Sequence, residues 1–72
     1  MEVVRDCTGQ YLRAKNGQDF RVCNFAILDP YETGEKIQVE YDLMEECFGL
    51  LEPVTCTTPH IFESRIDVTK VY

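Results

Sequence analysis

The chain has 72 residues and a mass of 8.4 kDa, enough for one small domain over residues 1–72 and too little for a two-domain enzyme. Hydrophobic residues make up 44% of it and charged residues 28%, which excludes a disordered tail. Seven Lys and Arg against thirteen Asp and Glu give a net charge of −6, which argues against duplex nucleic acid as the main partner. A chain of this size buries only about 60% of its unfolded surface, so we expect additional covalent stabilisation.

A β-hairpin is predicted around residues 15–17, where Lys-Asn-Gly separates two segments of period-two patterning. A two-residue loop would pair apolar with charged side chains on both faces of the hairpin. A three-residue loop with its glycine in the left-handed conformation pairs Leu12 with Phe20 and Arg13 with Asp19. We predict this second register, in which the first of these pairs faces the core.

The second strand of this hairpin is predicted to end near Leu28, before a loop over residues 29–35 that contains the turn residues Pro30 and Gly34. Apolar and polar residues then alternate from 36 to 43. This alternation is typical of a half-buried strand.

The chain after Asp42 allows two interpretations. Asp42 stands three residues before Glu45, a spacing similar to a capping box, and apolar residues then recur at helical intervals as far as Leu51. These features predict one short helix. Alternatively, the preceding strand continues to Met44 and residues 45–53 form an ordered loop.

Two further strands complete the predicted fold: a short edge strand over residues 54–58, between two prolines, and a last strand over residues 64–71. Five short strands in a small chain favour a barrel, because a barrel leaves few exposed sheet edges. The predicted fold class is therefore all-β, possessing at most one short helix, as a small five-stranded OB-fold-like barrel. An SH3-like barrel is the alternative.

Two segments, residues 17–24 and 34–41, enter strands through a glycine and polar residues followed by alternating apolar residues, and residues 66–71 alternate in the same way. Through these segments the chain resembles small OB-fold-like domains of uncharacterised bacterial exported proteins and lipoproteins. The resemblance implies a fold and no particular activity.

The four cysteines, Cys7, Cys23, Cys47 and Cys56, are an even number in a domain that is short of core, which favours two disulfides. A bond between Cys47 and Cys56 closes a loop of about 10 residues and is the pairing we expect. In the predicted hairpin Cys7 and Cys23 are diagonal neighbours about 7–8 Å apart, slightly too far for a disulfide without a bulge. The alternative is four reduced cysteines that behave as small buried hydrophobic residues.

Metal binding and catalysis find little support in the sequence. Cys56 and His60 are spaced like half of a zinc site, but no Cys-x-x-Cys pair accompanies them, so we expect no metal and no cofactor. His60 is the sole histidine and Ser64 the sole serine, and there is no Gly-rich phosphate loop. We therefore expect a protein that is not an enzyme.

The best candidates for a binding surface are Tyr11, Arg13, Lys15 and Arg21 on the outer face of the hairpin. Tyr11 and Arg21 are predicted cross-strand neighbours that stack as a ring and a cation. OB-folds bind single strands with aromatic platforms beside a basic groove. The same side chains also fit an ordinary solvated face with an ion pair between Arg13 and Asp19.

Two functions follow as expectations. The first is a disulfide-stapled binding or accessory module, exported to the periplasm or cell surface, whose ligand is an unknown protein or small molecule. The second is a cytosolic interaction domain with reduced cysteines that contacts single-stranded nucleic acid. In both cases we expect a monomer without a membrane span, because net charge resists association and no apolar run reaches the roughly 18 residues that a span needs. The first twenty-five residues also lack the continuous apolar stretch of a signal peptide.

Overall fold

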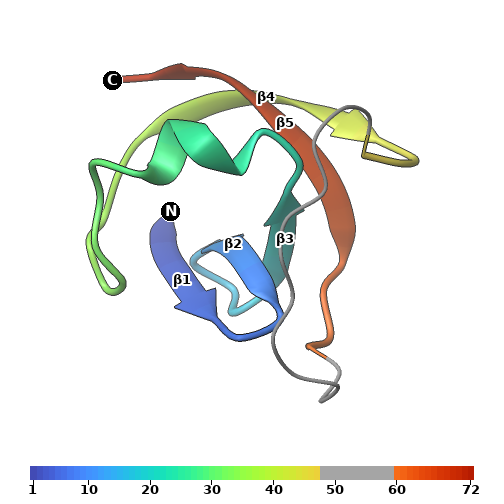
Figure 1. Cartoon of the computed structure of the whole chain (residues 1–72), viewed down its shortest axis with the longest axis horizontal. Coiled ribbons are helices and arrows are strands. Elements are labelled where there is room, and N and C mark those ends of the chain that lie inside the picture. The colour runs from blue at the N-terminus through green and yellow to red at the C-terminus, as the bar shows by residue number, and fades with distance from the viewer. Residues whose placement is uncertain (48–59) are drawn as a thin grey trace.

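The computed structural model describes residues 1–47 and 60–72. These residues form one mixed, strongly curved sheet of five strands in the order β1-β2-β3-β5-β4 (Figure 1). The strands are β1 Glu2–Asp6, β2 Gly9–Arg13, β3 Asp19–Val22, β4 Val39–Met44 and β5 Ser64–Val71. The only helical element of the described residues is the short 3-10 turn η1, Phe25–Leu28. The all-β class is as predicted, and the sheet has five strands, although β1 was not among the predicted ones.

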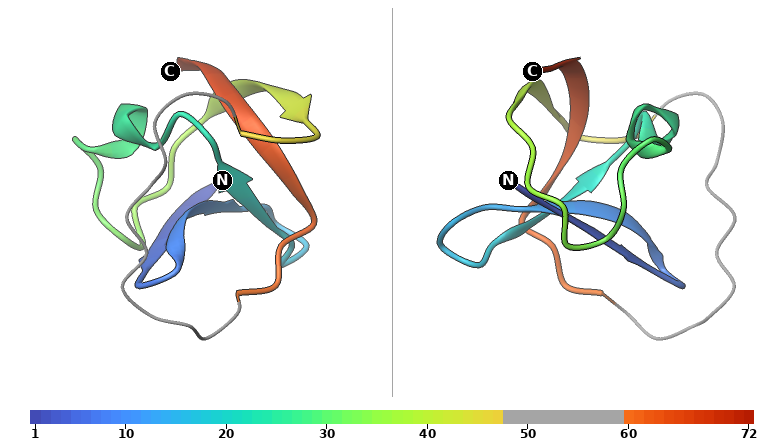
Figure 2. Two further views of the ribbon diagram at one scale, coloured as in Figure 1. Left: turned by 45° about the vertical axis from the view of Figure 1, so that its right-hand side comes forward. Right: turned by 90° about the vertical axis from the view of Figure 1, so that its left-hand side faces the viewer.

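The first three strands form an antiparallel meander, and β3 then pairs with β5 in parallel. In the right-hand view of Figure 2, β2 runs nearly horizontally, whereas β5 rises steeply. The interior of this curl holds the core, whose fully buried side chains are Val3, Leu12, Val22, Leu28, Ile66 and Val68. Each strand except β4 contributes at least one of them, so the core depends on long-range pairing.

A closed barrel is not formed, which corrects that part of the prediction. β1 and β4 are the two edges of the sheet. Residues 34–37 nevertheless run along the outer edge of β1, where the amide of Val3 donates to the carbonyl of Glu35 and the amide of Ile37 to that of Met1, both at 2.8 Å. These bonds satisfy backbone groups of β1 that would otherwise be unpaired.

The predicted hairpin register is confirmed. Leu12 lies opposite Phe20, and Arg13 opposite Asp19. Gly17 has a φ of +85°, the left-handed conformation that the three-residue loop requires.

Replacing Gly17 with alanine is expected to destabilise the domain by about 1 kcal/mol, because an L side chain is disfavoured at positive φ. Nothing lies within 4 Å of the position of the added Cβ, so the cost comes from the backbone and not from a clash. Urea denaturation measures the change. Gly34, at a φ of +92° and with equally open surroundings, provides a second test, and no loss of stability in either alanine variant would contradict the argument.

The second strand of the hairpin is shorter than predicted, because β3 ends at Val22 and not near Leu28. The side chain of Asn24 replaces the continuing strand. Its amide nitrogen donates to the carbonyl of Val68 at 2.6 Å, and its oxygen accepts from the amide of Val68 at 2.8 Å. An asparagine side chain offers the same donor and acceptor as a peptide unit, so the chain can leave the sheet and turn into η1.

Of the two interpretations after Asp42, the extended strand is confirmed, since β4 runs to Met44. The predicted helix start is wrong, because residues 42–44 are paired with β5. The rest of that helix and the predicted strand over 54–58 lie outside the described residues. The last strand, 64–71, is confirmed. The sequence interpretation missed β1, for which Val3 and Val4 were the available β-forming signal.

Candidate functional site

The outer face of the hairpin is covered by the chain that leads into β5. Tyr11 points to this face, yet only 1% of it is exposed. The ring of His60 stacks on the Tyr11 ring, with centroids 3.8 Å apart and an interplanar angle of 12°, and Phe62 lies 6.0 Å away. The amide of Glu63 donates to the carbonyl of Asp19 at 2.7 Å. Residues 60–63 therefore form a strap, held by ring stacking and a backbone bond.

His60 lies between two carboxylates. Its Nδ1 is 2.6 Å from an oxygen of Asp6, at the end of β1, and its Nε2 is 2.6 Å from an oxygen of Asp19, at the start of β3. An ionised carboxylate accepts hydrogen bonds and donates none, while a neutral imidazole has only one N–H. Both contacts are therefore satisfied together by the imidazolium form of His60.

The surroundings raise the pKa of His60 and lower the pKa values of Asp6 and Asp19, which favours the charged form of all three side chains. Burial lowers the pKa of His60, but its hydrogen bonds to Asp19 and Asp6 and their charges raise that pKa above the usual 6.5. Burial raises the pKa of Asp6, but hydrogen bonds from Thr8 and His60 bring it down to about 2. The hydrogen bond from Arg13 lowers the pKa of Asp19, opposed by burial and assisted by His60. At neutral pH both carboxylates are thus ionised partners of the ring.

Arg13 completes the cluster on one side. Its Nε and Nη2 donate to the two oxygens of Asp19 at 2.7 and 3.1 Å, the bidentate arrangement that arginine forms well with carboxylates. The expected Arg13–Asp19 pair is confirmed. The Arg13 guanidinium is therefore already engaged.

On the other side Arg21 donates to the carbonyl of Thr8 at 2.9 Å and to the hydroxyl of Tyr11 at 3.1 Å. The Thr8 hydroxyl donates to Asp6, so the 2.8 Å contact between the Thr8 and Tyr11 hydroxyls uses the Tyr11 proton. Arg21 also lies 5.7 Å from the Tyr11 ring centre, which confirms the predicted cation–ring neighbours. Among the described residues, the Tyr11 hydroxyl therefore both donates to Thr8 and accepts from Arg21.

Of the four predicted binding residues, the structure brings Tyr11, Arg13 and Arg21 together and places Lys15 elsewhere. It does not offer Tyr11 as a stacking platform, because His60 covers the ring. The sequence analysis considered His60 as half of a zinc site and missed its two acidic partners.

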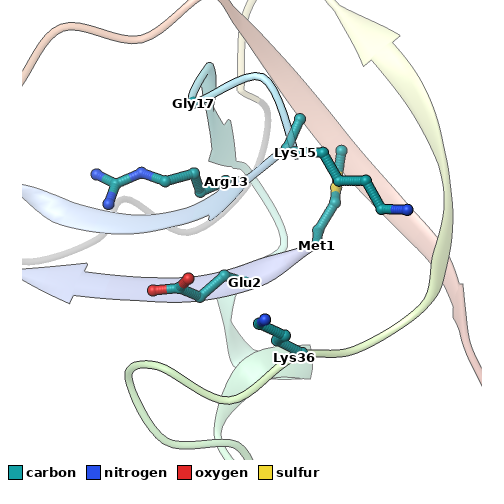
Figure 3. A pocket seen from close by; sticks show the side chains of 7 residues that line it. Met1, Glu2, Arg13, Lys15, Gly17 and Lys36 are labelled. Atoms are coloured by element: carbon teal, nitrogen blue, oxygen red, sulfur yellow. The ribbon is translucent and has the colours of Figure 1, made fainter.

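A second feature, at the loop end of the hairpin, is a pocket of about 370 Å³ (Figure 3). It is bounded by the start of β1, the hairpin loop and the segment that covers β1, through Met1, Glu2, Arg13, Ala14, Lys15, Gly17 and Lys36. Lys15 therefore belongs to this pocket and not to the stacked face.

Cys23 and Cys47 form a disulfide, with Cα atoms 5.0 Å apart. The expected pairing of Cys47 with Cys56 is therefore wrong. The reason is topological: β3 and β4 flank the same strand, and Val22 and Leu43 both lie opposite Ile66. This brings together chain segments that are remote in sequence.

Cys7 is also disulfide-bonded, and the described part of the chain has no free cysteine. The zinc half-site considered for Cys56 and His60 is not supported, because both nitrogens of His60 contact carboxylates and the sulfurs of Cys23 and Cys47 bond to each other. Within residues 1–47 and 60–72 no His, Cys, Asp and Glu side chains are grouped as metal ligands. None of the helices in these residues is long and apolar enough to cross a membrane.

No family model, no curated protein and no solved structure matches the chain.

Proposed function

We propose that the chain is a disulfide-stabilised binding module of an exported protein and that it is not an enzyme. The observation that carries the proposal is the Cys23–Cys47 disulfide, together with the disulfide-bonded state of Cys7. Disulfides persist in oxidising compartments and are rare in the cytosol. They also compensate small domains for a limited core, and the core cluster formed by residues 1–47 and 60–72 has six buried side chains.

The proposed architecture is a partly open OB-like barrel. The strand order β1-β2-β3-β5-β4 and the parallel β3–β5 pair support it, as does the chain along the edge of β1. OB-folds are partly open five-stranded barrels that act mainly as binding domains. The proposal therefore joins a binding architecture to an exported location.

The engagement of His60 supports binding over catalysis. A general acid or base needs a nitrogen that can reach a substrate proton. Both nitrogens of His60 contact carboxylates, and its ring lies flat against Tyr11.

The covered Tyr11 ring also favours the exported module over the alternative of a cytosolic single-strand-binding domain. Base stacking requires an open aromatic face, and here 1% of Tyr11 is exposed. For an oligonucleotide to stack there, residues 60–63 would first have to leave the hairpin.

The thiol state in living cells tests the proposal. Cells that produce the protein from its own gene are quenched in acid and alkylated under denaturing conditions without reductant, and the intact mass is then measured. We expect all four cysteines to remain unalkylated, whereas a cytosolic protein from the same sample should be fully alkylated. Acid quenching matters because air oxidation after lysis can create disulfides that the cell does not contain.

Four alkylated cysteines would overturn the exported module and move the protein to a reducing compartment. A zinc assay on natively purified protein is the companion measurement. Stoichiometric zinc would also overturn the proposal, because metal-bound thiolates are not disulfides.

A further inference from the structure

We propose that the pocket at the loop end of the hairpin binds a small organic dianion, with Lys15 and Lys36 as its charged contacts. The inference deepens the proposed binding function and rests on it, because it names the ligand class of the module. Three features of the pocket carry it: its charge, the availability of its cations, and its size.

The pocket concentrates the positive charge of an acidic chain. Three of the seven Lys and Arg residues line it, Arg13, Lys15 and Lys36, against one of the thirteen Asp and Glu residues, Glu2. Charge of one sign in a concave site focuses its electric field and raises the local concentration of oppositely charged ligands. The rest of the acidic surface repels anions, so this pocket is the favoured place for one.

Two of these three cations are available to a ligand. Arg13 is bound to Asp19 and lies opposite Glu2 across the β1–β2 pair. Glu2 is also the bridge partner of Lys36, so its backbone lies between Arg13 and Lys36. Figure 3 shows the Glu2 carboxylate directed to the Arg13 side of the pocket, away from Lys15. Within the described residues, neither Lys15 nor Lys36 forms an ion pair or a side-chain hydrogen bond, and both are exposed.

The position of these two lysines indicates a ligand with two negative groups. Met1 lies between Lys15 and Lys36 (Figure 3), and Met1 and Ala14 provide apolar lining. Figure 3 shows the two ammonium groups on different sides of Met1, each at the end of a flexible four-carbon stem that can swing over the pocket. An anion with one charge at each end and a short carbon body would bring both ammonium groups to it and cover this apolar surface. Lysine binds anions as a mobile point charge and does not demand the planar geometry that arginine does, so carboxylates and phosphate esters both fit.

The size excludes a polymer as the occupant. A volume of about 370 Å³ falls near the lower end of the range for small-molecule sites. An oligonucleotide needs a groove lined by several cations and aromatic faces. None of the described residues that line the pocket is aromatic, and Tyr11, the ring predicted to stack on bases, is buried. A small dianion uses only the two free lysines.

The test is an NMR titration of the full, oxidised chain at constant ionic strength. The probes are succinate and inorganic phosphate, and the uncharged analogue succinamide serves as the control. We expect saturable shifts in the backbone amides of Lys15, Gly17 and Lys36 for at least one anion and none for succinamide. Saturation by succinate identifies a dicarboxylate-type ligand, and saturation by phosphate identifies a phosphate-type ligand.

Three variants make the assignment specific. The double variant Lys15→Gln/Lys36→Gln should weaken binding at least tenfold, because both ammonium groups are lost. Lys70→Gln removes one charge elsewhere, where Lys70 lies over the ring of Tyr72, and should bind like the wild type. Lys15→Gln alone, which matches the charge of the Lys70 variant, should fall between them.

Linear shifts without saturation, or equal weakening in the Lys70 variant, would overturn the site. This result is distinguishable from failure of the proposed function. Disulfides in the cell with no anion binding would remove only this ligand class. Reduced cysteines with specific anion binding would remove the export and keep the pocket.

Discussion

Replacing Cys23 and Cys47 together with alanine is expected to lower the free energy of unfolding by about 3 kcal/mol, because the bond restricts the unfolded chain. The two cysteines are separated by 24 residues, a loop that crosses from β3 through η1 to the end of β4. Alanine is the suitable replacement, since Cys23 is only 8% exposed and a serine hydroxyl would be buried there. Urea denaturation of the oxidised proteins gives the difference.

The double variant also avoids thiol–disulfide exchange, because a single substitution would leave one thiol free to attack the disulfide of Cys7. The mass of each protein under non-reducing conditions must show that this second disulfide is retained. A loss below about 1 kcal/mol would mean that β3 and β4 are held together without the bond.

The hairpin was predictable because its signals are local. A Lys-Asn-Gly loop and the alternation on either side fix which residues face each other, and Arg13 met Asp19 as expected. The last strand was predictable for the same reason, since Ile66 and Val68 alternate with polar residues and both are buried. In these elements each decision depends on neighbours within a few positions.

The disulfide partner and the role of His60 were not predictable, because both depend on β5. That strand joins β3 in parallel at residues 64–66, a pairing that no local pattern announces. Once β5 is in place, its preceding residues pass over the hairpin and carry His60 to Asp19, 41 positions away. The same strand separates β3 from β4 and so decides which cysteines meet.

Asp6 and Asp19 illustrate the same limit in the electrostatics. In the sequence analysis Asp19 has one partner, Arg13, and this ion pair is enough to account for its negative charge. In the structure Asp19 also faces His60, and the two acids would repel across the strap without a cation between them. The histidine therefore acts as the central charge of the outer face, and its protonation state governs how firmly the strap is held.

The domain is expected to lose stability as the pH rises above about 6.5, the ordinary pKa of histidine. The hydrogen bonds to Asp19 and Asp6 raise the pKa of folded His60 against the effect of burial, so the folded state holds this proton more tightly than the unfolded state does. This contribution is fully present below the unfolded pKa and disappears as the pH rises through the folded one. Losing one charge-assisted hydrogen bond should cost about 2 kcal/mol.

At acidic pH the dependence of stability on pH has the opposite sign, so the domain loses stability as the pH falls. The folded pKa of Asp6 is lowered to about 2 from its usual 3.8, chiefly by hydrogen bonds from Thr8 and His60 that outweigh burial. Its contribution is present above 3.8 and is lost as the pH falls towards 2. The pKa of Asp19 moves in the same direction. Together these groups place the maximum of the stability curve at about pH 4 to 6.5.

His60→Phe isolates the effect, because phenylalanine keeps a ring over Tyr11 but neither titrates nor donates to the two carboxylates. We expect the variant to be less stable than the wild type at pH 6 by about 2 kcal/mol and the difference to shrink towards pH 8.5. Other groups that titrate in this range are present in both proteins and cancel. Imidazole nitrogen chemical shifts of the wild type should show both nitrogens protonated at pH 6. A neutral ring there, or parallel stability curves for the two proteins, would mean that His60 holds the strap through stacking on Tyr11 alone.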